Sequence, residues 1–284
     1  MLYDCVIIGT GPAGVSAALN LKIHEKNFLW IGSKSLSDKI AKAERISNYP
    51  GFTHATGAQL IEAFRSQVEA MDISIHEAMV NSILPMGDHY ALSAGSDFFE
   101  TRTIILSTGV AQTATLPGES DKVGMGVSYC ATCDGMLYRG KTIAVICANP
   151  RFEHEVEFLS GLAHTVYFFP TYKNSALTGD NVVRPEGRIN QVLGEGRVTG
   201  VRLTTGEEIE INGLFCLRDS ISLATLLPGL ATENGHISVD RSMATSLPGV
   251  YAAGDCTGRP YQYTKAVGEG NVAAHSVLDY LAAK

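Results

Sequence analysis

The chain has 284 residues, of which 45% are hydrophobic and 18% are charged, and its formal net charge at pH 7 is −7. This length allows two domains of ordinary size, and the composition excludes an intrinsically disordered protein. The negative charge argues against broad nucleic-acid binding, and the sequence has no apolar run of the roughly 18 residues that would span a membrane.

The first elements in chain order predict a dinucleotide-binding unit. An apolar strand over residues 3–8 begins almost directly after Met1, without the segments of a secretory signal, so we expect a cytoplasmic protein. The strand leads into Gly9-Thr10-Gly11-Pro12-Ala13-Gly14, a helical pattern and a second strand over residues 28–31. Glycines at this spacing allow a tight turn and let the backbone approach a pyrophosphate at the helix N-terminus. The alternative is a glycine-rich turn that only packs against its neighbours.

The end of the second strand lacks one expected residue. An acidic side chain usually binds the adenosine ribose at this point, but the chain has Gly32-Ser33-Lys34-Ser35. Ser33 or a backbone group could substitute, so the ribose contact stays unassigned.

Two cysteines separated by two residues form the most informative motif, Cys130-Ala131-Thr132-Cys133-Asp134-Gly135. A zinc site would need a second pair of ligands, and the sequence contains neither another Cys-x-x-Cys nor a His-x-x-x-His. We therefore expect no metal and interpret the pair as a redox-active dithiol. The other four cysteines are expected to be buried apolar side chains: Cys5, Cys147, Cys216 and Cys256.

A second βαβ unit follows the dithiol. Strands are predicted over residues 141–146 and 166–169, a helix over 153–162, and a hairpin from residue 198 onward. The first unit resumes near the C-terminus with a strand that ends in Gly254-Asp255. The prediction is an α/β protein with one domain over residues 1–113 and 243–284, and an inserted domain over 114–242.

With these motifs in this order, the chain resembles low-molecular-weight thioredoxin reductase over essentially its full length. The similarity includes Asn48-Tyr49-Pro50-Gly51 and the C-terminal helix over residues 262–274. The resemblance implies a two-domain flavoprotein disulfide reductase fold, in which a discontinuous Rossmann-like domain binds FAD and the inserted domain, of the pyridine-nucleotide type, carries the Cys-x-x-Cys. It also implies a homodimer and thioredoxin as the electron acceptor. The residues expected to bind the cofactor are Gly9, Gly11, Pro12, Ala13, Gly14, Asn48, Thr108, Gly109, Gly254, Asp255, Tyr261 and Gln262.

Roles for individual residues come from the same resemblance. Cys133 is expected to contact the flavin, Cys130 to attack thioredoxin, and Asp134 to act as general acid and base. An alternative role for Asp134 is to cap a helix that begins at the Cys-x-x-Cys. Asp255 would point at the ribityl chain or simply cap the following helix, and Tyr261 would shield the flavin or pack in a core or dimer interface.

The inserted domain departs from the family pattern where NADPH should bind. The glycine-rich turn of the family is replaced by Cys147-Ala148-Asn149-Pro150-Arg151-Phe152, which contains no glycine. The family's His-Arg-Arg, whose arginines bind the 2′-phosphate, is replaced by Pro170-Thr171-Tyr172. The loop after the second strand of the first domain also differs, with Ser37-Asp38-Lys39-Ile40 in place of Gly-Gly-Gln-Leu.

This combination is similar to the ferredoxin-dependent flavin thioredoxin reductases, which keep FAD and the dithiol but take electrons from ferredoxin. Residues 22–45 carry six basic and three acidic side chains, which indicates either a solvated surface or a docking patch for an acidic partner. Three other functions stay open: an oxygen-dependent flavin dithiol oxidase, an NADPH-dependent thioredoxin reductase with an atypical site, and a flavin-binding scaffold without activity.

Overall fold

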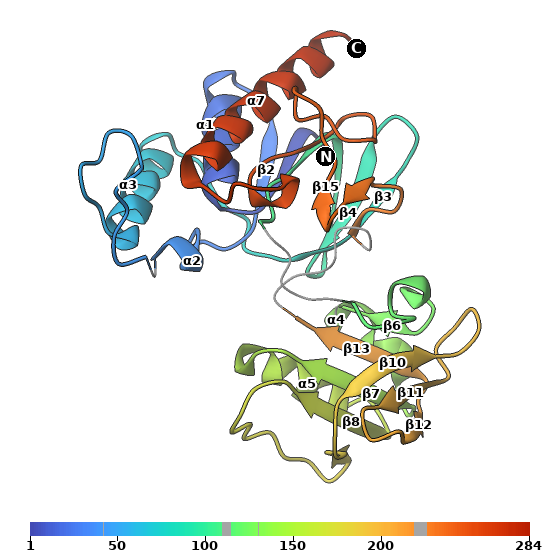
Figure 1. The fold of residues 1–284 in the computed structure, drawn as a ribbon. Coiled ribbons are helices and arrows are strands. Elements are labelled where there is room, and N and C mark those ends of the chain that lie inside the picture. The colour runs from blue at the N-terminus through green and yellow to red at the C-terminus, as the bar shows by residue number, and fades with distance from the viewer. Residues whose placement is uncertain (42, 110–114, 130, 219–225) are drawn as a thin grey trace. The chain divides into compact units, whose positions relative to one another are not determined.

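The chain divides into two compact units, each built around its own sheet (Figure 1). The computed structural model describes residues 1–41, 43–109, 115–129, 131–218 and 226–284. Unit 1 comprises Met1–Ala111 and Leu226–Lys284, and unit 2 comprises Gln112–Thr225. The chain therefore leaves unit 1, builds unit 2 and returns, which confirms the predicted discontinuous α/β architecture.

Unit 1 contains a sheet in the order β2-β1-β5-β4-β3, with β16 paired to β5. Strands β1, β2 and β16 are parallel to the second half of β5, whereas β3 and β4 form an antiparallel extension. The parallel strands are continuous apolar runs because both of their faces are covered. The strand bounds are β1 (Leu2–Ile8), β2 (Phe28–Ile31), β3 (Val80–Pro85), β4 (Tyr90–Ala94), β5 (Asp97–Leu106), β14 (Thr232–Glu233), β15 (His236–Ile237) and β16 (Val250–Ala252).

The register of this sheet decides where the loops of unit 1 meet. Ile8 and Ala252 both pair with Leu106, so β1, β5 and β16 end at the same edge. Ligands of open α/β sheets bind beyond the carboxyl ends of such strands. The three loops that follow these strands are therefore brought together, although they are far apart in the sequence.

Helices cover the sheet of unit 1. They are α1 (Pro12–Ile23), α2 (Asp38–Ala41), α3 (Gly57–Ala70), the 3-10 turn η4 (Asp255–Thr257) and α7 (Tyr263–Ala282). Helices α1 and α7 pack side by side (Figure 1). Helix α3 begins with a capping box, in which the Thr56 and Gln59 side chains bind each other's backbone N–H groups. Its buried residues Leu60, Phe64 and Val68 recur every fourth position and form its apolar face.

Unit 2 contains a fully parallel sheet in the order β6-β13-β7-β8-β9 and a smaller antiparallel sheet, β10-β11-β12. Its strands are β6 (Val127–Ser128), β7 (Thr142–Cys147), β8 (Thr165–Pro170), β9 (Val182–Val183), β10 (Ile189–Leu193), β11 (Gly200–Leu203), β12 (Glu208–Glu210) and β13 (Gly213–Leu217). Its helical segments are η1 (Ser120–Lys122), α4 (Ala131–Asp134), η2 (Gly135–Tyr138), η3 (Pro150–Phe152) and α5 (Glu153–Ser160). The predicted strands and helix of this unit are thus confirmed as β7, β8 and α5.

Residues 226–242 group with unit 1, although the sequence analysis places them in the inserted domain. Strands β14 and β15 form a short hairpin here, and the Ala231 backbone N–H donates to Ser246 Oγ at 2.9 Å. The contacts of this segment are with the C-terminal part of unit 1, which no local pattern in the sequence reveals. The division into functional domains stays a prediction, and the compact units differ from it in these residues.

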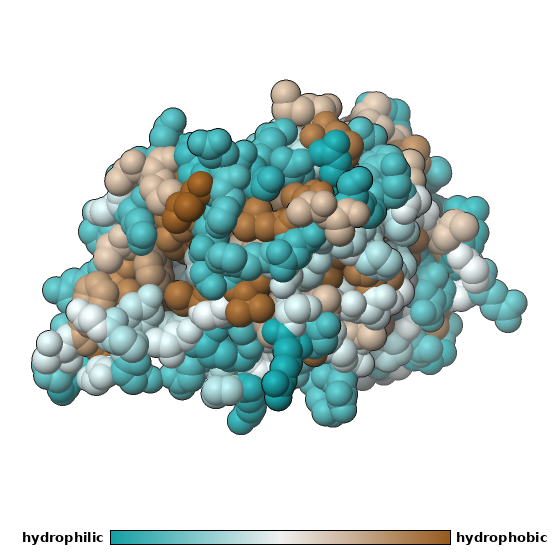
Figure 2. Space-filling view, turned by 90° about the horizontal axis from the view of Figure 1, so that it is seen from above, coloured by the Kyte–Doolittle hydropathy of each residue, from teal (hydrophilic) through white to brown (hydrophobic). Residues whose placement is uncertain are grey.

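The surface shown in Figure 2 is mainly hydrophilic, with separate hydrophobic patches between the polar side chains. Among the described residues, no helix is both long enough and apolar enough to cross a membrane.

Candidate functional site

A cavity of about 300 Å³ lies in unit 1 at the edge where β1, β5 and β16 end. The turn after β1, the loop after β5, η4, the start of α7 and the segment around α2 form its walls. The residues that line it are Gly9, Thr10, Gly11, Pro12, Ala13, Leu36, Ser37, Ile40, Ser107, Thr108, Gly109, Asp255, Gln262, Tyr263 and Ala266.

The glycine-rich turn after β1 is closely packed at two of its glycines and open at the third. Gly9 has a φ of +109°, and a Cβ there would lie 2.3 Å from the Ser107 carbonyl oxygen. A Cβ at Gly14 would lie 2.1 Å from the Gly9 carbonyl oxygen. In contrast, a Cβ at Gly11 would meet nothing within 4 Å, so the backbone there is open. The described part of this turn supplies no side-chain cap for α1, which leaves N–H groups at the helix N-terminus for an anionic ligand.

The loop that carries Asp255 is held by two side chains from α7. Lys265 Nζ donates to the carbonyl oxygens of Gly254 and Gly258 at 2.9 and 2.8 Å. Glu269 Oε2 accepts from the Gly254 backbone N–H at 2.8 Å and lies 3.2 Å from Lys265 Nζ. Both side chains are only 18% exposed. This clamp fixes the backbone on both sides of Asp255, which lines the cavity.

Three further candidates in unit 1 are Asn48, Tyr261 and Gln262, of which Gln262 lines the cavity. Asn48 does not line it but donates from Nδ2 to Gln262 Oε1 at 2.7 Å, and Gln262 does line it. Tyr261 is 40% exposed, and its hydroxyl lies 2.6 Å from His236 Nε2. Arg259 lies over the Tyr261 ring at 5.5 Å. Tyr261 is thus held by polar and cationic contacts within unit 1, and its relation to the flavin stays a prediction.

The dithiol motif lies in unit 2 around the four-residue helix α4. Cys130 lies outside the described residues, and for Cys133 the structure describes the backbone, which is helical. The helix begins at Ala131 and ends at Asp134, which is also the N-cap residue of η2, although its side chain accepts no capping hydrogen bond there. The alternative role of Asp134 as the N-terminal cap of this helix is therefore wrong, because a cap must precede the first turn.

Helix α5 packs against α4 and places a carboxyl group at the N-terminus of α4. Gly135, directly after α4, has so little space that a Cβ would approach the Phe158 and Leu159 side chains at 3.0 and 3.1 Å. Glu155 of α5 accepts a hydrogen bond from the Ala131 backbone N–H, yet burial outweighs this contact and raises the pKa of Glu155 above 4.5. A carboxyl group with a raised pKa therefore lies at the N-terminus of the dithiol helix.

The turn after β7, where the family binds NADPH, is occupied by the chain's own side chains. Asn149 Oδ1 accepts from the Arg151 backbone N–H at 3.1 Å and so caps η3. The Tyr172 hydroxyl donates to Glu153 Oε1 at 2.7 Å, and the pKa of Glu153 is lowered first by a hydrogen bond from the Ser175 side chain and then by this one. Helix α5 thus begins with carboxylates, Glu153 and Glu155, where a pyrophosphate would need positive or neutral surroundings.

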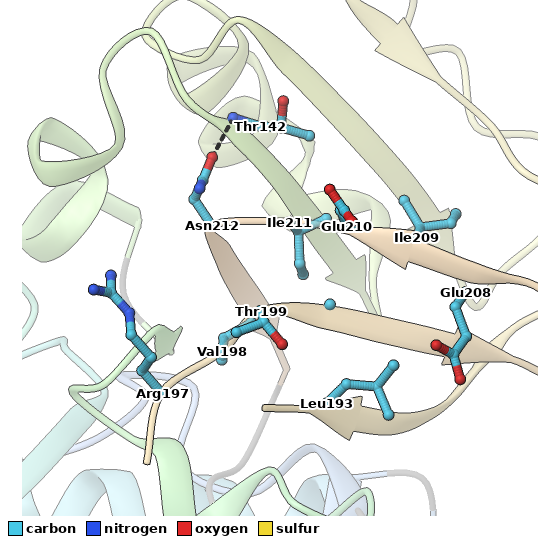
Figure 3. Close-up of a pocket in the computed structure, with 11 residues that line it drawn as sticks. Thr142, Leu193, Arg197, Val198, Thr199, Glu208, Ile209, Glu210, Ile211 and Asn212 are labelled. Carbon is cyan, nitrogen blue, oxygen red and sulfur yellow. Dashed lines mark hydrogen bonds between the residues drawn. The ribbon is translucent and has the colours of Figure 1, made fainter. Parts of the chain in front are cut away.

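A larger cavity of about 680 Å³ lies elsewhere in unit 2, between the small sheet and the start of β7 (Figure 3). At one end, Asn212 Oδ1 accepts from the Thr142 backbone N–H at 3.1 Å. At the other, Glu208 Oε1 accepts from Arg202 at 2.7 Å. None of the described side chains that line it belongs to a predicted site, so volume alone does not identify the reactive region.

The four cysteines outside the motif are buried and free. Burial raises the pKa of Cys5 to about 12 and that of Cys256 to about 11, and it also raises the pKa values of Cys147 and Cys216. Within the described parts of the chain, no cluster of His, Cys, Asp or Glu could hold a metal ion.

The structure brings most predicted cofactor residues of unit 1 together and adds some that sequence reasoning missed. Gly9, Gly11, Pro12, Ala13, Thr108, Gly109, Asp255 and Gln262 line one cavity, whereas Gly14, Asn48, Gly254 and Tyr261 lie outside its lining. The sequence patterns did not predict Leu36, Ser37 and Ile40, which lie in the loop where the family's Gly-Gly-Gln-Leu is absent. They also did not predict the Lys265–Glu269 clamp. The spacing of Lys265 and Glu269 by four residues in a helix was the available signal.

The chain is similar to known proteins both in sequence and in fold. The family model described as pyridine nucleotide-disulphide oxidoreductase matches residues 3–148 and 177–270. A thioredoxin reductase from Treponema pallidum is 30% identical over 98% of this chain and 97% of its own length. The crystal structure of a ferredoxin-flavin thioredoxin reductase from Clostridium acetobutylicum is 41% identical, covers 100% of this chain and 98% of its own, and has a TM-score of 0.87. A thioredoxin reductase from Gloeobacter violaceus is 29% identical, covers 99% and 95%, and has a TM-score of 0.76.

Proposed function

The chain belongs to the pyridine nucleotide-disulphide oxidoreductase family, and we propose that it reduces thioredoxin with electrons that pass from ferredoxin through FAD. The coarser assignment is established by its thioredoxin reductase relatives: the chain is a flavoenzyme that acts on disulfides, with FAD as its cofactor. The cavity of unit 1 fits this cofactor, because Gly11 and the start of α1 leave an open cradle for phosphate.

One observation carries the choice of electron donor. The turn after β7 contains no glycine, and its helix begins with two carboxylates, one of them bonded to Tyr172. A pyrophosphate there would meet negative charge and a backbone it cannot approach closely. Ferredoxin needs no such pocket, since it delivers single electrons at a protein surface. The similarity to the Clostridium acetobutylicum ferredoxin-flavin thioredoxin reductase supports the same choice.

The energetics permit this route. Plant-type ferredoxins lie at about −400 mV and thioredoxin at about −270 mV, so the transfer of two electrons releases roughly 6 kcal/mol. NADPH is therefore not needed as a driving force.

The dithiol carries the electrons to the acceptor. FAD, when bound, supplies the two electrons that break the Cys130–Cys133 disulfide. The Cys130 thiolate then attacks the thioredoxin disulfide, so that a bond forms between the two proteins and the bond within thioredoxin breaks. Cys133 attacks Cys130 next, which releases the second thioredoxin thiol and re-forms the Cys130–Cys133 disulfide. Asp134 accepts and returns the proton that the thiols exchange.

We also propose that the enzyme is a cytoplasmic homodimer with an FAD-binding domain of residues 1–113 and 243–284 and a dithiol domain of residues 114–242. The buried, free state of the four described cysteines is consistent with a reducing compartment. Sedimentation equilibrium of the FAD-loaded protein tests the dimer, and a mass equal to one chain contradicts it.

Anaerobic photoreduction tests the donor directly. The purified enzyme is mixed with thioredoxin and a light-driven ferredoxin system, and thioredoxin thiols are counted with and without NADPH. We expect thiols to form with ferredoxin alone, and Cys133→Ser to abolish them. Thiol formation with NADPH alone supports the atypical NADPH enzyme instead, and oxygen consumption with a small dithiol supports the oxidase.

A further inference from the structure

One buried carboxylate in unit 2 holds three separate segments. Glu119 is fully buried and accepts hydrogen bonds from the Tyr129 hydroxyl at 2.8 Å and from the Leu116 backbone N–H at 2.9 Å. Arg218 donates to both of its oxygens, at 2.7 and 3.2 Å. Tyr129 and Arg218 are 5% and 6% exposed. The buried charges are thus paired and hydrogen-bonded, as burial of ions requires.

The partners of Glu119 lie near the two ends of unit 2 and directly before the dithiol motif. Leu116 lies shortly after the chain enters unit 2, and Arg218 follows β13 shortly before the chain leaves it. Tyr129 directly precedes Cys130. Strands β6 and β13 are parallel neighbours, with Phe215 paired to Ser128, so Tyr129 and Arg218 emerge at the same end of the sheet.

A buried ion pair is weak evidence for a stabilising role. Well-packed apolar side chains of similar volume commonly stabilise a protein as much as a buried ion pair does. Tyr129 is a neutral donor at physiological pH, because burial and the Glu119 carboxylate raise its pKa far above its usual value. The cluster links the segment before Cys130 to the segments around Leu116 and Arg218 through hydrogen bonds to one carboxylate.

We infer that Glu119, Tyr129 and Arg218 are positioning residues for the dithiol. They hold the backbone at Tyr129, directly before Cys130, and this restraint reduces the conformational freedom that the motif loses when its disulfide closes. A preorganised pair of thiols has a higher effective concentration, which favours the disulfide. This inference rests on the proposed redox role of Cys130 and Cys133, but not on the identity of the electron donor or acceptor.

The test compares two tyrosine variants of unit 2. Tyr129→Phe removes the hydrogen bond to Glu119, and the control Tyr172→Phe removes a bond of the same kind to Glu153 at 2.7 Å. The FAD-loaded full chain is equilibrated with reduced and oxidised glutathione, and the Cys130–Cys133 disulfide is quantified by alkylation and mass spectrometry. In this exchange the dithiol loses two electrons and two protons, and glutathione disulfide gains them.

We expect Tyr129→Phe to lower the equilibrium constant for the Cys130–Cys133 disulfide about three- to tenfold, and Tyr172→Phe to leave it unchanged. A tenfold change corresponds to about 30 mV. Arg218→Lys, which keeps the charge but loses the paired geometry, should give an intermediate value. Thermal unfolding of each variant separates this role from a purely structural one. If the disulfide constants of the three variants fall only in proportion to their melting temperatures, the inference is overturned.

Equal exchange constants for Tyr129→Phe and Tyr172→Phe overturn the inference. This outcome is distinct from failure of the proposed function, which shows as a wild-type enzyme that forms its disulfide but does not reduce thioredoxin. In that second case a lowered constant in Tyr129→Phe still supports the positioning role.

Discussion

The side-chain amide of Asn48 donates a hydrogen bond to Oε1 of Gln262 at 2.7 Å, although the two residues are 214 positions apart. Gln262 precedes α7 and lines the cavity of unit 1. The bond therefore ties the loop around residue 48 to the edge of the cavity. Both residues are predicted from the family resemblance to bind the flavin, and within unit 1 they lie next to each other.

The Asn48–Gln262 bond should contribute to FAD binding. We expect Asn48→Ala to weaken FAD affinity about two- to tenfold, since a hydrogen bond contributes about 0.5–1.5 kcal/mol. Fluorescence titration of the FAD-free protein measures this affinity. Asn271→Ala is a matched control, because Asn271 donates to Asn20 at 3.1 Å in a similar amide pair outside the cavity lining. Equal losses in the two variants would mean that the Asn48 bond has no specific role.

NADPH should not reduce the flavin at physiological concentration. The described turn after β7 is capped by Asn149 and followed by the Glu153 carboxylate, which leaves no neutral helix end for a pyrophosphate. Anaerobic mixing, followed at the flavin absorbance band, measures this, with dithionite as the positive control. Rapid bleaching by NADPH would falsify the argument from the turn.

The two motif cysteines should behave differently toward thioredoxin. Cys133→Ser should form a stable mixed disulfide through Cys130, because only the second thiol can resolve that intermediate. Cys130→Ser should form none. Non-reducing gel electrophoresis with mass spectrometry identifies the adduct. If the adduct forms with Cys130→Ser instead, the two roles are exchanged.

The four cysteines outside the motif should be unreactive in the folded protein. Their thiols are buried and their pKa values are raised, so little thiolate is present at pH 8. Alkylation of the dithiothreitol-reduced enzyme with iodoacetamide should therefore label Cys130 and Cys133 quickly and the four buried thiols much more slowly, because burial both raises their pKa values and shields them from the reagent. Denaturation before labelling is the control, and all six should then react. Fast labelling of Cys147 in native protein contradicts the prediction.

Glu155 should make the stability of unit 2 depend on pH. Its folded pKa is raised, so its favourable contribution is fully present below the unfolded value of about 4.5 and is lost as pH rises through the folded pKa. Glu155→Gln mimics the protonated form and should stabilise unit 2 at pH 7, with the difference shrinking toward pH 4.5. Hydrogen exchange of the β7 and β13 amides measures this. The exposed Glu157→Gln serves as the control, and a gain of the same size in that variant would remove Glu155 from the explanation.

Much of this protein is determined by short stretches of its sequence. The apolar runs of β1, β7 and β8 form buried parallel strands, and the glycines between residues 9 and 14 form a turn, because backbone sterics and burial act over a few residues. The loss of glycine from residues 147–152 is equally local. For these elements the sequence is sufficient, because each pattern allows few other conformations.

Tertiary structure decides which distant groups meet. Asn48 and Gln262 pair because the fold of unit 1 brings the loop between α2 and α3 next to the start of α7, and Glu119, Tyr129 and Arg218 meet because β6 is adjacent to β13. Sequence reasoning assigned Glu119 and Arg218 no role, since a lone Glu or Arg is usually a solvated surface residue. Their burial becomes favourable only when the folded sheet supplies every hydrogen-bond partner at once, and that condition depends on strand order rather than on any local pattern.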